Sequence, residues 1–246
     1  MAVAVAGSLI TAAVLGAIAA MFRRARRRWR PINVTVERVI PEGWRVVLPA
    51  GLPADAANLT TNELTSPPAV YEWLCDRGAI DHFETTLRLY VEGLSDRTVV
   101  VCNIGVELDR SVPAECTLVS SPTAGANSAT LLMFELDTDP VDAWEWQDQS
   151  GPRVKVGGAP FFATNNITLG KNEVHEVIVV GRTALHHCRW TLAFDVQVGR
   201  RRTTIRVDNA GRPFETVGEP SSGFKERIHW AWYQGGGFAP EPGYDD

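Results

Sequence analysis

The sequence predicts an all-β domain, an antiparallel β-sandwich with one short helix inserted, behind a single N-terminal transmembrane helix. Short runs of alternating apolar and polar residues recur from residue 32 onward, and turn residues such as Gly, Asp, Asn and Pro separate them. Residues 1–22 form a separate apolar run without a charged side chain. We therefore expect four segments: a transmembrane helix at 1–22, a basic juxtamembrane segment at 23–30, the sandwich at 31–217 and a flexible aromatic and acidic tail at 218–246.

The apolar run is long enough to cross a bilayer. A helix rises about 1.5 Å per residue, so the run would span roughly 30 Å, the thickness of the hydrocarbon core. Arginines at the end of a span favour the cytoplasmic side, so we expect the N-terminus outside and the C-terminal domain inside. Abundant Arg and Ala with only three lysines suggest a GC-rich bacterial source, and hence a single-pass protein of the inner membrane. The expected membrane-interface residues are Arg23, Arg24, Arg26, Arg27, Arg28, Trp29 and Arg30.

A cleaved secretory signal is the alternative interpretation of this segment. Small residues at Ala17 and Ala19 would suit a signal peptidase, but signal peptides place their positive charge before a shorter apolar run. The span also carries a small residue at every fourth position, which would let two helices approach closely and form a homodimer. These small residues are Ala4, Ser8, Ala12, Gly16 and Ala20.

Charge is divided unevenly between the anchor and the rest of the chain. Six of the 24 basic residues lie in segment 23–30 and all 29 acidic residues lie beyond it, so residues 31–246 carry 18 minus 29, or −11, formal charges. An acidic domain repels a phosphate backbone, so we expect no nucleic acid partner. The lipid bilayer, whose anionic headgroups attract arginine, is the partner expected of the basic segment.

The four cysteines leave the compartment open. Cys75, Cys102, Cys116 and Cys188 would suit two disulfides in an exported protein, whereas on the cytoplasmic side they should be free thiols. Cys102 and Cys188 occupy apolar faces of predicted strands, where an unpaired cysteine packs as a small hydrophobic residue. The state of the thiols therefore separates a cytoplasmic from an exported domain.

The domain begins with two strands and a helix. Residues 32–40 alternate apolar and polar side chains and predict a first strand, and residues 44–48 return as a second strand after a Pro-Glu-Gly turn. Ser66 can cap a helix whose first positions are prolines, and Gly78 can end it. The three- and four-residue spacing of its apolar side chains predicts that one face of this helix packs onto a sheet.

Strands make up most of the chain after this helix. The longest has one wholly apolar face and one polar face, and Asp208-Asn209-Ala210-Gly211 predicts a hairpin turn. Short strands at near-regular spacing are typical of a sandwich, and this pattern predicts an immunoglobulin-like one. The expected strands are 86–91, 102–108, 116–120, 131–136, 167–169, 174–180, 188–198 and 203–207.

A histidine pair beside a cysteine is the first candidate for chemistry. His186 and Cys188 are two residues apart and could share one face of a strand, while His187 would point to the other face. His175, on another predicted strand, could lie near them. No second pair at zinc-ligand spacing and no CxxC motif accompany them. We therefore expect no metal and no cofactor, and we interpret the pair as residues at a strand edge.

A stripe of carboxylates is the second candidate. Glu135, Asp137 and Asp139 alternate along one predicted strand, and Asp142 comes shortly after. Calcium takes several such oxygens at once, but the spacing lacks the loop glycine of an EF-hand. Acidic residues also commonly protect a solvated sheet edge. The stripe is therefore interpreted as a solvated edge, with calcium as the alternative.

Nucleophilic catalysis and phosphate binding lack their motifs. No G-x-S-x-G elbow occurs. Gly170-Lys171 superficially resembles the end of a P-loop, but Asn165 stands in place of its first glycine and Asn172 in place of the magnesium ligand. We expect no catalytic residues. Because distant residues can assemble a site in space, an enzyme with a noncontiguous site is a third hypothesis, ranked after two binding functions.

The C-terminal segment carries aromatic residues of a kind that bind proteins. Ile228-His-Trp-Ala-Trp-Tyr233 lies between Gly-, Pro- and Ser-rich stretches, and exposed Trp and Tyr are common anchors at protein interfaces. Trp230, Trp232 and Tyr233 are therefore the expected partner-binding residues. The alternative is that this segment forms a last strand or packs back on the sandwich.

Together these features predict a binding or scaffolding module at the cytoplasmic face of the membrane, with a protein partner and without catalysis. β-Sandwiches bind through loops and exposed edges, and a tether raises the local concentration of a membrane-associated partner. The alternative is an exported or cell-surface sandwich, anchored or cleaved, that binds glycan or protein.

Overall fold

Strands dominate the computed structural model of this chain, which describes residues 30–41, 43–58, 66–121, 130–147, 154–231 and 236–241. In these residues two short α-helices occur, α2 (Pro67–Cys75) and α3 (Phe161–Thr164), with a 3₁₀ turn over Ala54–Asn58. The prediction of an all-β domain is confirmed.

The expected membrane anchor lies almost entirely outside the described residues. Positions 1–29 hold the apolar run and every residue of the basic segment except Arg30. Within the described part of the chain, no helix has both the length and the apolar character needed to cross a bilayer. Arg30 is exposed just ahead of the first strand.

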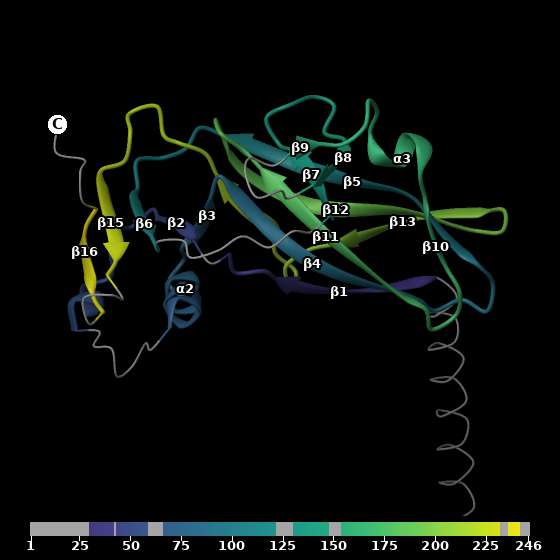
Figure 1. Cartoon of the computed structure of the whole chain (residues 1–246), viewed down its shortest axis with the longest axis horizontal. Helices are drawn as coiled ribbons and strands as arrows, with labels where there is room; N and C mark the ends of the chain where they lie inside the picture. Colours follow the sequence, from purple (N-terminus) through teal and green to yellow (C-terminus); the bar gives the residue numbers. More distant parts are fainter. Residues whose placement is uncertain are drawn as a thin grey trace, which may run out of the picture.

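The strands form two sheets (Figure 1). The first has six strands, in the order β1 (Ile32–Arg38), β4 (Glu84–Gly93), β11 (Val174–Arg182), β7 (Thr130–Glu135), β8 (Ala143–Gln147) and β9 (Val154–Lys155). The second has ten, in the order β10 (Ile167–Leu169), β5 (Val99–Ser111), β12 (His187–Val198), β14 (Phe214–Val217), β3 (Ile80–His82), β2 (Arg45–Leu48), β6 (Thr117–Ser120), β15 (Glu226–Trp230) and β16 (Phe238–Pro240), with β13 (Arg201–Val207) paired beside β12.

Both sheets are mixed, which corrects the prediction of an antiparallel sandwich. Strand β11 pairs in parallel with β7, β14 with β3, and β15 with β6. Each of these pairs joins strands that are separated by other strands along the chain. Alternation within a strand does not reveal which distant strand becomes its neighbour, so the sequence pattern could not show these pairings.

A shared core lies between the long strands of the two sheets. Apolar side chains at alternate positions of β4 and β11 meet those of β12 in it. Trp190 is fully buried there and donates its indole N–H to Thr216 Oγ1 at 3.0 Å. Gly181, in the first sheet, leaves room for this ring, because a Cβ at that position would lie 2.5 Å from it. Two layers around one core make the domain a sandwich.

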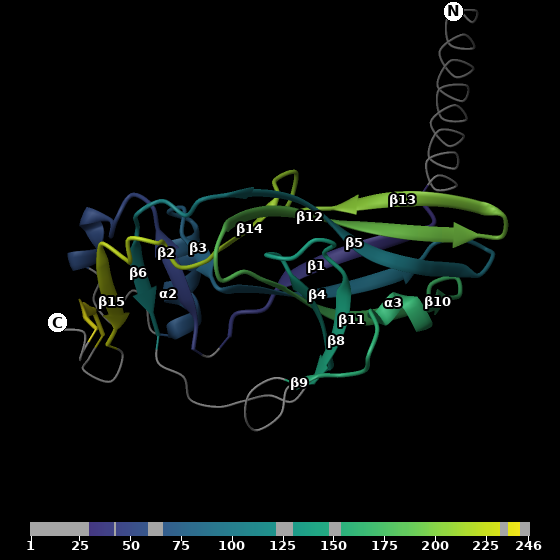
Figure 2. The ribbon, with the colours of Figure 1, turned by 90° about the horizontal axis from the view of Figure 1, so that it is seen from above.

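The second sheet continues past the first at one end of the molecule (Figures 1 and 2). Strands β3, β2, β6, β15 and β16 form this extension, and α2 covers one of its faces. The predicted cap of the helix is confirmed, because Ser66 Oγ accepts a hydrogen bond from Ala69 N at 3.5 Å. A second core lies between helix and sheet and includes Trp44, Tyr71, Leu74, Val119 and Trp230.

The described residues of segment 218–246, predicted to be a flexible tail, contain two strands of this extension. β15 pairs with β6 on one side and with β16 on the other. Ile228 and Trp230, two residues apart, pack into the core under α2, and Trp230 is 1% exposed. Glycine and proline residues around them mark turns of a folded segment. The sheet therefore extends beyond the predicted boundary at residue 217.

Candidate functional site

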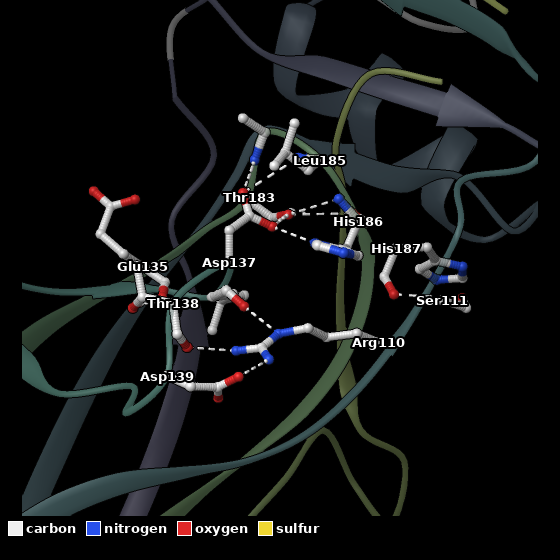
Figure 3. Close-up of polar contacts among 12 residues, drawn as sticks. Arg110, Ser111, Glu135, Asp137, Thr138, Asp139, Thr183, Leu185, His186 and His187 are labelled. Carbon is white, nitrogen blue, oxygen red and sulfur yellow. Dashed lines mark hydrogen bonds and ion pairs between the residues drawn. The ribbon is translucent and has the colours of Figure 1, made fainter. Parts of the chain in front are cut away.

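A dense group of polar contacts surrounds the loop that joins β11 to β12, residues 183–186 (Figure 3). All four backbone N–H groups of this 183–186 loop have acceptors, at 2.6 to 3.2 Å. These acceptors are Phe83 O, Asp137 Oδ2, which takes two N–H groups, and Thr183 Oγ1. Because every amide is bonded, a change in the loop's conformation would cost several hydrogen bonds at once.

Asp137, two residues after β7, is the centre of this group. Its Oδ1 accepts from Thr183 Oγ1 and from His186 Nδ1, both at 2.7 Å. Its Oδ2 accepts the backbone N–H groups of Ala184 and Leu185, at 2.6 and 3.2 Å. Partial burial alone would raise the pKa of Asp137, but these four hydrogen bonds together hold the pKa below its ordinary value. Asp137 is therefore an ionised clamp that fixes the loop.

Arg110, near the end of β5, fixes the segment that carries Asp137. Its guanidinium donates to Leu136 O at 2.6 Å, to Thr138 O at 2.5 Å and to Asp139 Oδ2 at 2.8 Å. The hydrogen bond from Arg110 also keeps the pKa of Asp139 below its ordinary value. Several acceptors spread around one planar fork suit arginine and not lysine.

The turn after β14 closes the loop from the other side. Gly218 N donates to His186 O at 2.8 Å, and Glu219 N donates to Ala184 O at 3.0 Å. Gly218 has no room for a side chain, because a Cβ would lie 2.4 Å from the carbonyl carbon and oxygen of Ala184. The loop is thus held by the carboxylate of Asp137 on one side and by a closely packed backbone on the other.

Leu185 projects from this held loop into solvent and is 65% exposed. Val112, directly after β5, is 77% exposed at the same end of the sandwich, because Ser111 pairs with His187 at the start of β12. Among the described residues, three large hydrophobic side chains are exposed, and the third, Val174 at 55%, begins β11 at its opposite end. Two of the three therefore lie at the end that Asp137 organises.

The histidine pair and the acidic stripe, predicted as separate candidates, meet at this site. His186 contacts Asp137, whereas His187 Nε2 lies 3.1 Å from Glu215 Oε2. Cys188 is fully buried in the shared core, and burial raises the pKa of its thiol. The prediction that His186 and Cys188 share one face of a strand is not confirmed, because β12 begins at His187 and His186 belongs to the loop before it.

His175, which could have lain near the pair by its place on a predicted strand, does not lie there. His175 is the second residue of β11 and pairs with Val91, while the 183–186 loop comes after the last residue of the same strand. An extended strand of this length places its two ends tens of ångströms apart. His175 therefore belongs to the opposite end of the sandwich.

Glu135, Asp137 and Asp139 of the stripe each have their own basic or N–H partner. Only Glu135 belongs to β7, where it pairs with Arg182 at 3.9 Å, and Asp139 pairs with Arg110. The stripe is thus a strand end and a turn, rather than one strand. Across the residues that the structure describes, no three His, Cys, Asp or Glu side chains converge as metal ligands.

The contact between Asp137 and His186 resembles part of a catalytic triad, since a carboxylate orients the ring through Nδ1. Within the described ranges, however, no serine, threonine or cysteine side chain is hydrogen-bonded to His186 Nε2. The nearby hydroxyl, that of Thr183, is bonded to the carboxylate itself. The arrangement therefore fixes a loop, and it presents the outer edge of the half-buried His186 ring beside Leu185.

The sequence-predicted partner residues of the C-terminal segment are not brought to this site. Trp230 is buried under α2, where its ring lies 5.0 Å from that of Phe238. Trp232 and Tyr233 lie outside the described residues, as do the membrane-interface residues other than Arg30. Of the three expected partner-binding residues, the structure therefore describes only Trp230, and this residue is buried.

A second polar network, around Asp81 in β3, fastens α2 and β1 to the extension. Asp81 Oδ2 accepts from Arg38 Nη2 at 2.6 Å, and Asp81 Oδ1 accepts from Tyr71 Oη at 2.6 Å. Burial, with the neighbouring Asp81, raises the pKa of Tyr71 far above its ordinary value, and burial raises the pKa of Cys75 to about 11. The network is therefore structural, and the thiol of Cys75 stays protonated at neutral pH.

His82 differs from both networks because it is buried without partners among the described residues. It is 5% exposed, and neither ring nitrogen has a hydrogen-bond partner there. Its ring packs on Phe83 and Phe224, with centroids 3.9 and 5.1 Å away. Burial, reinforced by the charges of Arg45 and Arg227, lowers the pKa of His82 to about 4. The ring is therefore neutral at neutral pH and serves as an aromatic filler.

Sequence reasoning missed Arg110, Thr183 and Leu185. Arg110 comes after a strand pattern that ends at residue 108, and Thr183 lies between two predicted strands, so neither carries a recognisable motif. Leu185 does carry a signal, because a leucine in the short connection between two strands has no place in either strand's apolar face. An apolar residue in a predicted turn was thus the one sequence clue to this site.

Comparisons of the chain with protein-family models, with curated proteins and with solved structures found no significant match.

Proposed function

We propose that this chain is a single-pass membrane protein whose sandwich binds a protein partner at the cytoplasmic face through the 183–186 loop. The observation that carries the proposal is the exposure of Leu185, at 65%, on a loop whose four backbone amides are all bonded within the domain. A preorganised apolar side chain binds with little further loss of conformational entropy. Leu185 is therefore the expected anchor of the interface.

The surroundings of Leu185 have the composition of a small interface. Val112 adds a second exposed apolar side chain at this end of the sandwich, and His186 and the ion pair of Arg110 with Asp139 supply polar groups at the same end. An apolar centre with a polar rim is the usual anatomy of a protein contact. Two apolar side chains suit a transient partner, and membrane tethering would offset a weak affinity by raising the local concentration.

The membrane part of the proposal is supported by the sequence. The apolar run at 1–22 and the arginines after it are the pattern of a single span with its basic flank on the cytoplasmic side. The placement of the cysteines agrees with a reducing compartment. Cys188 pairs with Arg110, eight residues from Cys102 along β5, or about 27 Å at the rise of an antiparallel strand. None of the four cysteines, all of which are described, is paired in a disulfide, and the proposal expects four reduced thiols.

An immunoglobulin-like form of the sandwich is also part of the proposal. A buried tryptophan, Trp190, packs between the two sheets, and loops gather at both ends of the long strands. Such domains bind through the loops at one end of the sandwich, which is where the 183–186 loop lies.

Site-specific photo-crosslinking in native membranes tests the proposal. A crosslinking amino acid at position 185 should capture one protein, and the same amino acid at position 174 is the matched control, since Val174 is also exposed but lies at the other end of β11. The captured protein should co-purify with the wild-type chain and with Val174→Glu, and be lost with Leu185→Glu. Capture from both positions alike, or retention by Leu185→Glu, would contradict the proposal.

A further inference from the structure

The chain enters the sandwich at the end opposite the 183–186 loop. Ile32, at the start of β1, pairs with Gly93 at the end of β4, and Leu94 N donates to Pro31 O at 2.8 Å. Val99, which begins β5, pairs with Val198, which ends β12. The turn between β12 and β13 therefore lies at the same end as the start of β1, as both views of the molecule show (Figures 1 and 2).

Exposed arginines gather at this end of an otherwise acidic domain. Arg200, Arg201 and Arg202 come after Gly199 in the β12–β13 turn, and all three are exposed. Arg97, in the turn between β4 and β5, is exposed beside them, because a Cβ at Gly199 would lie 3.8 Å from Arg97 Nη1. We call these four arginines the basic tip.

The basic tip is not neutralised by the described carboxylates around it. Among the described residues, none of its four arginines forms an ion pair, and Arg202 Nε donates to the neutral Gln197 Oε1 at 3.1 Å. The acidic neighbour Asp96 pairs instead with Lys171, at 2.5 Å. Arg30, exposed just ahead of β1, adds a further positive charge at this end. Residues 31–246 together carry −11 formal charges, so the tip is a local reversal of sign.

We propose that the basic tip is a second membrane contact of this protein, which binds the phosphate groups of anionic phospholipids at the bilayer surface. The inference rests on the proposed membrane tether, because the described chain begins with Arg30 at this end of the sandwich, so a tether formed by the preceding residues would hold the tip close to that surface. Arginine binds phosphate through a planar set of N–H donors, and basic residues near an anionic leaflet are attracted to it. The rest of the domain is acidic and is repelled by the same surface, so the tip would orient the sandwich on the membrane.

Hydrogen exchange of the full chain in lipid nanodiscs tests this contact. The amides of residues 199–203 should exchange about fivefold or more slowly in discs with one part phosphatidylglycerol to two of phosphatidylcholine than in pure phosphatidylcholine, a factor that corresponds to one arginine near an anionic surface. The turn at residues 208–212 serves as the internal control, because Val207 before it pairs with Leu192, six residues along β12 from Val198 at the tip. High salt should remove the difference.

Matched charge reversals separate a lipid contact from a general effect of charge. Arg201→Glu should abolish most of the slowing, whereas Arg212→Glu, the same change at another exposed arginine, should leave it intact. If the chain is inserted and its amides exchange equally in both kinds of disc, the proposal that the basic tip binds lipid is wrong, while the proposed tether is not contradicted. Recovery of the chain outside the discs would overturn both. Equal slowing by duplex DNA in neutral discs would show a general polyanion site and overturn the assignment to lipid.

Discussion

Three buried or half-buried polar side chains of this domain have different numbers of described hydrogen-bond partners. The effect on stability that we expect from substituting each of them differs accordingly. Asp137 accepts four hydrogen bonds, Asp81 is bonded to Arg38 and Tyr71, and His82 has no partner among the described residues for either ring nitrogen. Removing the partner of a buried polar group destabilises the fold, because the group is left without a hydrogen bond. A buried polar group that has no partner already destabilises the fold. Substitutions of Asp137 and His82 should therefore change stability in opposite directions.

Asp137→Asn should destabilise the domain and release the 183–186 loop. The amide keeps the size of the side chain, but it removes the charge and turns an N–H donor toward N–H groups that need an acceptor. We expect a loss of about 1–3 kcal/mol in the free energy of unfolding. The amides of Ala184 and Leu185 should exchange faster in the variant. Unchanged protection of these two amides would contradict the role of Asp137 as a clamp.

His82→Phe should stabilise the domain and remove part of its acid sensitivity. Because the pKa of His82 is lowered from 6.5 to about 4 in the folded chain, the unfolded chain takes up a proton first as the pH falls. The wild type should lose about 3 kcal/mol over this window, from pH 6.5 down to about 4, relative to the variant. Chemical unfolding at several pH values measures the difference. A gap between the two proteins that does not change with pH would count against a buried neutral histidine.

At the scale of elements, local pattern predicted the strands and helix α2 but not how they pair. The bulge in β5 shows why the pattern also mispredicted which residues of a strand face the core. Cys102 was expected to share an apolar face with Ile104, yet the register of β5 with β12 shifts between Asp195 and Val196, so Val101 reaches the core and Cys102 is half-buried. A bulge adds one residue and inverts the alternation beyond it, which simple periodicity does not show.

Two residues of the candidate site could be singled out from the sequence, but their contact with each other could not. Asp137 and His186 were both singled out, but they are 49 residues apart and are brought together because β7 pairs in parallel with β11. The contacts of Arg110 depend on the turn after β7, which has no sequence signature. A long-range strand pairing is set by the whole core, so it lay beyond the reach of local pattern.

Strand β15, in the segment 218–246 that was predicted to be a flexible tail, should contribute to the stability of the domain. Trp230→Ala would leave a cavity under α2 beside Trp44 and Phe238, and we expect a loss of about 3–5 kcal/mol. Trp73→Ala, at a half-buried tryptophan of α2, is the control and should cost less. Denaturant unfolding monitored by circular dichroism measures both. Equal, small losses would mean that Trp230 is not part of the core.

At the scale of the whole molecule, the two ends of the sandwich differ in chemistry. The long strands β5 and β12 separate the basic tip from the 183–186 loop by about 35 Å, at the rise of an extended strand. One end carries the arginines of the basic tip beside the entering chain, and the other carries Leu185 and Val112 on a bonded scaffold. This polarity suits a tethered domain that touches lipid with one end and a protein with the other.

Fluorescence quenching by lipid-attached quenchers tests this two-ended arrangement most directly. The full chain is placed in vesicles that contain phosphatidylglycerol, with a fluorescent amino acid either at the exposed Thr203, beside the basic tip, or at Leu185. We expect strong quenching at position 203 and none at position 185. Quenching at position 185 equal to that at 203 would mean that Leu185 inserts into lipid, and it would contradict a loop held free for a protein partner.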